Sequence, residues 1–380
     1  MNFELSTEQE DIQRAASEFA KGEFDPDVAL EMDQDGRFPE SIWRKACRLG
    51  FVGLHYPEEY GGQGLGFLEN VLVIEAFCRV DSGIGAALSM ADLGAEILIK
   101  FSSDEQKKWF LPPLAKGEKR LSLAFAESED GRDISSISTV AEKRLEKYVI
   151  RGRKKFVLNA SLADAFIVLC KEPNEGSVTL IVEKEREGIE VRTIEKMGLR
   201  MIPFGDLKFK DVSVPYESRL GNRGEGILHV EHGHKALGLR GLAQALGTAQ
   251  GAFDRAMLYA KQREQFGRKL SQFQVIRHKL ADMAASIEVA RWLTYKSAID
   301  YDQGETASDC LPIAQLEVKR RMVGVVDEAL QIFGGYGYIA EHDIEHYFRD
   351  EWAIGVNLGK EESLKDTIVQ KKLSLDPHKS

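Results

Sequence analysis

The pattern of apolar and polar residues divides the chain into three regions. Up to about residue 118, apolar residues such as Ile12, Ala15 and Phe19 recur every three or four positions, which indicates amphipathic helices. From 119 to 222 the apolar runs become short and β-branched, with glycine-containing turns between them, which indicates strands. From 223 onward the helical spacing returns. The sequence therefore predicts an α+β, mainly α, protein.

Three domains follow from these regions. We expect an N-terminal helical domain (1–118), a central small antiparallel β domain (119–222) and a C-terminal four-helix bundle (223–380). The bundle is indicated by a continuous apolar stripe that includes Ile276, Leu280, Met283 and Ile287. A second long helix is expected over 311–333. Long helices with small apolar faces usually pack as an antiparallel bundle.

The composition describes an ordinary globular protein. Of the 380 residues, 43% are hydrophobic and 29% charged, and the net charge is -10. That charge argues against nucleic acid or an anionic membrane surface as the main partner. No apolar run is long enough for a membrane span. The four cysteines are scattered and the N-terminus is acidic and amphipathic, so we expect a cytoplasmic protein with reduced thiols.

One motif near the C-terminus is more specific. The segment Gln331–Tyr338 reads QIFGGYGY and is followed by Arg349 and Asp350. Together with the order of helices, β domain and helical bundle, this segment resembles the acyl-CoA dehydrogenase family. The resemblance implies an FAD-dependent oxidoreductase that dehydrogenates an acyl-CoA thioester. It also implies an oligomer, with electron-transfer flavoprotein as the electron acceptor.

Two groups of residues match the family's contacts to the adenosine side of FAD. Arg263 and Phe266 lie in REQFG, which matches the family pattern R-x-x-F-G, and Gln331, Gly334 and Gly335 match the remaining contacts. An arginine offers a forked donor to a pyrophosphate, and a phenylalanine offers an apolar wall. In the family these residues reach across a subunit interface to the flavin of the neighbouring chain.

The positions that hold the flavin ring differ from the family. Ala126 and Leu158 stand where the family has threonines that hydrogen-bond the ring, and Arg132 replaces a serine near the acyl-CoA. Each lost hydrogen bond costs roughly 1 kcal/mol. Phe156 replaces a tryptophan and can still pack against a flavin. The chain's own flavin site is therefore expected to be weak.

The catalytic base of the family is also missing. Its usual glutamate position is Leu358, and the alternative position falls at Leu237 and Gly238. Asp92 is the remaining candidate, because a carboxylate in an apolar stretch is costly to bury unless it is paired or functional. Some family members that act on alicyclic acyl-CoA esters use an aspartate of this domain. The alternative is an ordinary aspartate on a polar helix edge.

Two groups of histidines are further candidates for metal ligands. His229, His232 and His234 have a spacing that can bind a metal, but no carboxylate or cysteine pattern accompanies them. His342 and His346 lie four residues apart among acidic residues, which predicts a solvated helix face. The sequence predicts no metal site.

Three functions remain open at this point. The first is a base-lacking subunit of a heteromeric acyl-CoA dehydrogenase that shares FAD with a catalytic paralogue. The second is a complete FAD enzyme with Asp92 as a relocated base, acting on an unusual, alicyclic acyl-CoA. The third is a flavin monooxygenase on the same fold. Loss of a general base typically costs 10²–10⁴-fold in rate, so an unmodified family enzyme is the least favoured.

Overall fold

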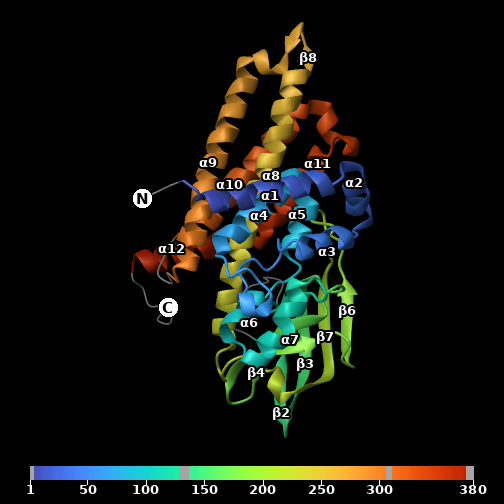
Figure 1. Ribbon diagram of the computed structural model, residues 1–380, viewed down its shortest axis with the longest axis vertical. Coiled ribbons are helices and arrows are strands. Elements are labelled where there is room, and N and C mark those ends of the chain that lie inside the picture. The colour runs from blue at the N-terminus through green and yellow to red at the C-terminus, as the bar shows by residue number, and fades with distance from the viewer. Residues whose placement is uncertain (1–3, 128–136, 305–309, 374–380) are drawn as a thin grey trace.

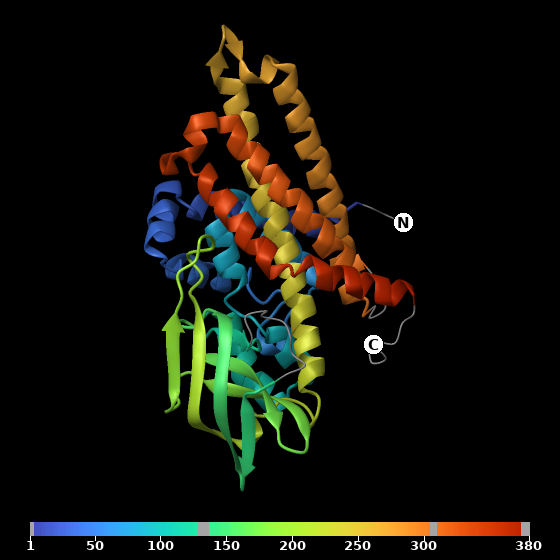
Figure 2. The ribbon, with the colours of Figure 1, turned by 180° about the vertical axis from the view of Figure 1, so that it is seen from behind.

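The computed structural model describes residues 4–127, 137–304 and 310–373. The molecule is elongated, with helices over most of its length and a β-sheet at one end (Figure 1). The rear view shows α8, α10 and α11 lying side by side, with the first part of α8 running down beside the sheet (Figure 2). Among the described residues, no helix is long and apolar enough to cross a membrane. The predicted α+β, mainly α, class is confirmed.

The N-terminal region contains seven α-helices among the described residues. The first begins with a capping box, in which the Ser6 hydroxyl accepts a hydrogen bond from Gln9 N and the Gln9 side chain accepts one from Ser6 N. This is the start that a Ser-x-x-Gln sequence favours. The helices are α1 (Thr7–Glu23), α2 (Pro26–Asp35), α3 (Glu40–Arg48), α4 (Phe67–Val80), α5 (Ser82–Ser89), α6 (Ala95–Phe101) and α7 (Asp104–Ala115).

The described part of the central region forms one seven-stranded sheet with its own apolar core. Most neighbouring strands are antiparallel, as predicted, but β4 lies parallel to both β1 and β2. The sheet is therefore mixed rather than purely antiparallel. Its strands are β1 (Leu121–Ala124), β2 (Val140–Arg144), β3 (Lys147–Leu158), β4 (Ala165–Glu172), β5 (Gly176–Glu183), β6 (Ile189–Thr193) and β7 (Phe204–Pro215).

The C-terminal region is a bundle organised around the longest helix, α8. Together, α8 and the N-terminal helices form one continuous apolar core. Gly247 permits this packing, because a Cβ at that position would lie 2.4 Å from the Glu75 carbonyl oxygen of α4. The elements are α8 (Gly226–Gln262), β8 (Glu264–Gln265), β9 (Arg268–Lys269), α9 (Gln274–Asp302), α10 (Cys310–Phe333), α11 (Ile344–Asn357) and α12 (Glu361–Lys372).

Helix α8 determines how far apart the candidate site residues lie. Its first residue, Gly226, packs against β5, and its last turn leads into the β8–β9 hairpin at the opposite end of the molecule (Figure 1). At 1.5 Å per residue the helix is roughly 55 Å long. Residues at its two ends therefore cannot take part in one compact site of the same chain.

Candidate functional site

The usual base position is occupied by a buried leucine. Leu358 follows α11 as its C-cap and is fully buried. It packs against Gly241 of α8, where a Cβ would lie 2.9 Å from the Leu358 Cδ2. The alternative position, Gly238, faces Gln315 of α10. Neither position offers a proton acceptor with the basicity of a carboxylate.

Asp92 lies between α5 and α6, not within a continuous helix, and its backbone forms a bridge to Leu121. Its side chain is buried and already has two strong partners. Arg240 Nη1 lies 2.7 Å from Asp92 Oδ1, and the Tyr56 hydroxyl donates a 2.5 Å hydrogen bond to Asp92 Oδ2. Both carboxylate oxygens are therefore engaged by donors, which is the arrangement of a counter-ion.

Arg240 joins Asp92 to a second buried acid. Arg240 Nη2 lies 2.6 Å from Glu96 Oε1, and Arg240 also donates to the Ser89 carbonyl. Burial alone would raise the pKa of Glu96, but Arg240 and His55 outweigh burial and hold that pKa below its usual value. Burial opposes the charge of Arg240 as well, yet the two carboxylates raise its pKa. We call Asp92, Glu96 and Arg240 the buried triad.

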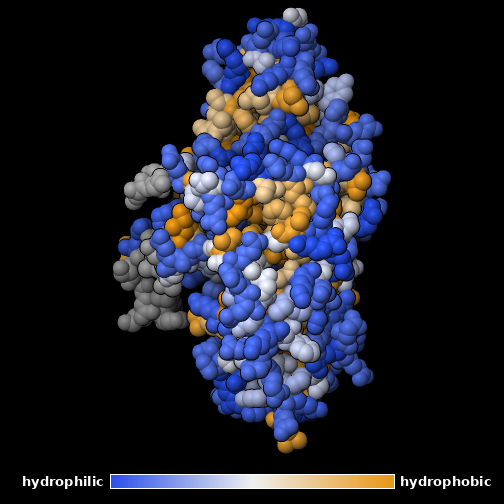
Figure 3. Space-filling view, viewed as in Figure 1, coloured by the Kyte–Doolittle hydropathy of each residue, from blue (hydrophilic) through white to orange (hydrophobic). Residues whose placement is uncertain are grey.

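The residues predicted to contact the adenosine side of FAD lie on an accessible surface. The Arg263 guanidinium lies 5.4 Å from the Tyr336 ring centroid, which brings the end of α8 beside the turn η4 (Gly334–Tyr338). Phe266 is 94% exposed, and a Cβ at Gly334 or Gly335 would meet no atom within 4 Å. The space-filling view shows apolar atoms exposed near this end of the molecule (Figure 3).

Gln331, in the last turn of α10 before η4, is also exposed. An arginine donor, an exposed aromatic ring and open glycine backbone are groups that can hold a pyrophosphate and an adenosine. The five residues predicted for this role therefore fit the adenosine diphosphate part of FAD.

The predicted ring-side residues lie on the sheet and fit a flavin poorly. Phe156 is 39% exposed and stacks on Phe204, with ring centroids 5.8 Å apart. Ala126 and Leu158 interact through their backbones, since the Ala126 carbonyl accepts from Lys155 N and the Leu158 carbonyl accepts from the Ser122 hydroxyl. Their side chains have no polar atom to offer a flavin ring. Arg132 lies outside the described residues.

The three clustered histidines have separate polar or aromatic partners, although the rings of His229 and His232 both contact Phe101. His229 Nδ1 lies 2.6 Å from the Thr179 hydroxyl, and His232 Nε2 lies 3.2 Å from the Tyr301 hydroxyl. The His234 ring contacts Phe125. They form no metal-binding group among the described residues.

The prediction of a solvated face was wrong for His346. This ring is buried, and its nitrogens lie 3.4 Å from Asp81 Oδ2 and 3.3 Å from Asp350 Oδ2. The sequence pattern was misleading because the adjacent acids Asp343 and Glu345 pair with Arg255 and Arg349. The ring itself faces inward, toward Asp81 and Asp350. His342 is only partly exposed and packs against the Phe333 and Tyr336 rings.

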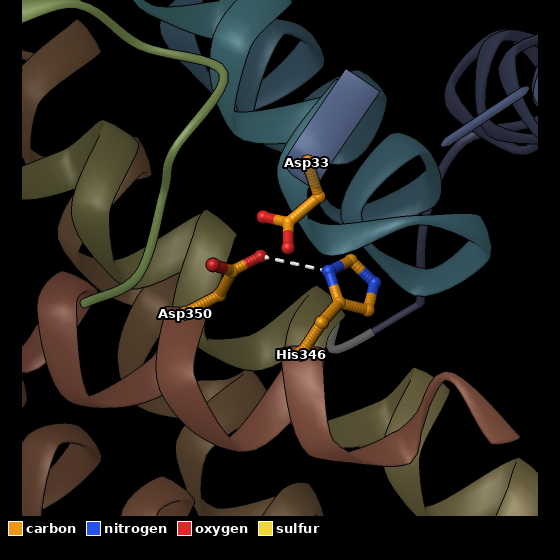
Figure 4. Close-up of side chains that lie close together, drawn as sticks. All are labelled: Asp33, His346 and Asp350. Carbon is orange, nitrogen blue, oxygen red and sulfur yellow. Dashed lines mark ion pairs between the residues drawn. The ribbon is translucent and has the colours of Figure 1, made fainter. Parts of the chain in front are cut away.

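Asp33, His346 and Asp350 point toward one another from α2 and α11 (Figure 4). Their ligand atoms lie within 4.8 Å of one another, a spacing that a metal ion could use. Other groups already occupy most of these atoms. Asp350 accepts from the Ser82 hydroxyl and Leu199 N, and Arg349 donates to Asp33. The surroundings therefore favour an ion-pair network that fastens α11 to α2, α5 and the segment before β7.

Comparison with known proteins agrees with this architecture. Residues 6–118 match the acyl-CoA dehydrogenase N-terminal domain, 122–212 the middle domain and 239–373 the C-terminal domain. The chain belongs to the acyl-CoA dehydrogenase family of oxidoreductases.

Several relatives are similar over nearly their whole length. A 3-(aryl)acrylate reductase of Clostridium sporogenes is 35% identical over 94% of this chain and 96% of the relative. The CarC subunit of the caffeyl-CoA reductase–Etf complex of Acetobacterium woodii is 33% identical, over 91% and 93%. The structure of butyryl-CoA dehydrogenase from Megasphaera elsdenii superimposes with a TM-score of 0.93 at 33% identity, covering 98% of this chain and all of that one.

Sequence reasoning selected Asp92 but missed its partners. The signal for Arg240 was present, because an arginine within the Gly- and Ala-rich stretch of α8 must be buried and therefore paired. Glu96 carried the same signal as Asp92, because it is a carboxylate in the same apolar stretch. Tyr56 carried none, since its contact with Asp92 depends on how the loop before α4 packs.

We predict that Asp92→Asn will lower the free energy of unfolding by about 1.5–3 kcal/mol, because an amide cannot replace the carboxylate in its charge-assisted hydrogen bonds to Arg240 and Tyr56. Asp254→Asn is the matched control, since its pair with Arg79 is exposed and is worth at most about 1 kcal/mol. Urea denaturation of the three proteins measures the difference. An Asp92→Asn protein of wild-type stability that loses turnover would instead identify Asp92 as a general base.

We also predict a pH-dependent contribution from His346. Burial opposes its charge, but Asp81 and Asp350 outweigh burial and raise its pKa well above 6.5. A raised pKa stabilises the fold fully below pH 6.5, and this stabilisation is lost as the pH rises through the folded-state pKa. The stability difference between wild type and His346→Gln, from urea denaturation, should therefore shrink between pH 6 and about pH 9. An equal difference at both pH values would refute the assignment.

Proposed function

We propose that this chain is the base-lacking subunit of a heteromeric acyl-CoA dehydrogenase-type enzyme. In this proposal the surface around Arg263 supports an FAD that a paralogous, base-carrying subunit holds by its ring. The single observation that carries the proposal is the buried Leu358 at the position of the family's catalytic base. That Arg263 serves a flavin of a neighbouring chain, as in the family, is supported by the distance between this chain's two sets of flavin-related residues.

That distance follows from α8. The hydroxyl of Ser122 donates to the Leu158 carbonyl, and the next residue, Leu123, packs against Gly233 of α8. The positions expected to hold the flavin ring therefore lie beside the turn of helix α8 that contains Gly233. Between Gly233 and Arg263 the helix is roughly 45 Å long, which exceeds the length of an extended FAD. Arg263 is therefore suited to a flavin whose ring is bound by a different chain.

The chemistry of the site supports the same division of roles. When bound, FAD supplies the acceptor for a hydride from the acyl group. A dehydrogenating subunit must also remove a proton from the neighbouring carbon, and Leu358 cannot accept one. Ala126 and Leu158 leave the ring without side-chain donors, so this chain is better suited to supporting a partner's site than to turnover in its own.

The complete-enzyme alternative depends on Asp92. Its burial beside α8 is consistent with a relocated base, but its bonds to Arg240 and Tyr56 would have to break before either oxygen could take a proton from substrate. No feature of the described residues favours a flavin monooxygenase. For the electron acceptor we propose electron-transfer flavoprotein, because the CarC relative is a subunit of an Etf complex.

We predict that Leu358→Glu will not make the isolated protein a dehydrogenase. The new carboxylate would be desolvated against Gly241 and would lack a flavin held by ring-side donors. Leu358→Gln is the control for side-chain size without charge. The measurement is bleaching of the flavin absorbance by a saturated acyl-CoA after anaerobic incubation with FAD. Rapid bleaching in the glutamate variant alone would contradict the proposal.

We predict that Arg263→Ala will weaken the flavin of the partner subunit. A charge-assisted contact to pyrophosphate is worth about 1.5–3 kcal/mol, so FAD should dissociate from the mixed assembly at least about tenfold more readily. Arg48→Ala, an exposed arginine on α3, is the control. Fluorescence of released FAD measures the effect. A partner flavin that is indifferent to Arg263→Ala would remove the argument for a shared site.

A further inference from the structure

A cavity of about 380 Å³ lies on the face of α8 that points away from Leu358. His232 and Lys235 of α8 line this cavity, whereas Gly241 packs on Leu358. His232 and Gly241 are nine positions apart, which is two and a half turns at 3.6 residues per turn. They therefore face opposite sides of the helix, so the cavity is separate from the usual base position.

The cavity combines an apolar floor with a charged rim. Leu65, Phe67 and Ile99 form the apolar floor. The Phe67 ring packs against the Tyr301 ring, with centroids 5.1 Å apart. Its volume is within the range of about 300–1,000 Å³ that is usual for small-molecule sites. A ligand with a short apolar body would therefore find contact area here.

The acidic groups of the cavity already have hydrogen-bond donors from the protein. Glu96 is paired with Arg240 at 2.6 Å. Asp302 accepts hydrogen bonds from the backbone N–H groups of Phe67 and Leu68, at 2.7 and 3.1 Å, at the N-terminus of α4. Neither carboxylate needs a cation from a ligand.

The cations of the cavity are not compensated in the same way. Within the part of the chain that the structure describes, Lys100 and Lys235 form no ion pair. Burial, with the nearby charges of Lys100 and Lys235, lowers the pKa of His232 to about 4, so this ring is neutral at pH 7. Two exposed lysines therefore line the cavity beside an uncharged imidazole.

His55 supplies an unused polar group. Its side chain is only 7% exposed and lines the cavity. Neither ring nitrogen makes a hydrogen bond, and Nε2 lies 3.2 Å from Glu96 Oε1 at an angle unsuited to one. Its Nε2 faces Glu96, whereas its Nδ1 has no protein partner. A buried polar atom without a partner costs free energy unless something else bonds to it.

We propose that this cavity binds a small carboxylate anion with a short apolar body. The carboxylate pairs with Lys100 and Lys235, an imidazole N–H of His55 or His232 donates to it, and the apolar body lies against Phe67 and Ile99. Glu96 belongs to both the cavity wall and the buried triad, so the bound anion lies one residue from the Arg240–Asp92 pair. The inference does not depend on whether the chain shares a flavin.

Isothermal titration of the purified full chain tests this, with benzoate as the probe and benzamide as its uncharged analogue. We expect saturable benzoate binding, with benzamide at least tenfold weaker. The double variant Lys100→Gln/Lys235→Gln should also bind benzoate at least tenfold more weakly, whereas Lys108→Gln/Lys261→Gln, which removes two lysines elsewhere, should stay within twofold of wild type. Ile99→Trp, which fills the cavity, should abolish binding.

Any one of three results would overturn the proposal: no saturable heat with benzoate in the folded wild-type protein, equal affinity for benzoate and benzamide, or wild-type affinity in the lysine double variant. Thermal melting of each variant shows whether it is folded. Should the double variant fail to fold, Ile99→Trp and the benzamide comparison still decide the question.

Discussion

The packing of α6 against α8 depends on one buried interaction, the pairing of Arg240 in α8 with Asp92 and Glu96. An isolated guanidinium in an apolar core would cost several kcal/mol, and Asp92 and Glu96 compensate for it from the segment between α5 and α6 and from α6 itself. This pairing fixes α6 against α8. It also makes Asp92, the candidate for a relocated base, a counter-ion of Arg240. Glu96 also lines the cavity that lies on the face of α8 away from Leu358.

Helix α8 also keeps the two sets of flavin-related residues of one chain far apart. Its length separates the ring-side positions near Gly233 from Arg263 and the η4 turn. The ion-pair network that includes His346, Asp350 and Asp33 fastens α11 to α2 (Figure 4). Leu358, which directly follows α11, is buried in the apolar core. An apolar side chain is stable there, whereas an ionised one is not.

Much of the fold could be predicted from the sequence, because its signals are local. The Ser6–Gln9 capping box and the apolar spacing of α9 and α10 depend only on residues a few positions apart. The parallel pairing of β4 with β1 and β2 could not be predicted, since strand order depends on contacts distant in sequence. Asp92 was expected in a helical run but lies between two helices, where Gly94 adopts a positive φ of 101° just before α6.

The sequence predicts the candidate site where residues match a family motif. It does not where the role of a residue depends on partners that are distant in sequence. Arg263, Phe266 and the Gly334–Gly335 pair lie together on an open surface, whereas the solvated face assigned to His346 is a buried ion-pair network. The role of the first group is still a proposal about assembly. Counting flavins per subunit tests it most directly. The account predicts that the isolated chain binds little FAD and that a mixed assembly with a base-carrying paralogue holds one FAD for every two subunits. One FAD per subunit in a homo-oligomer of this chain alone would contradict it.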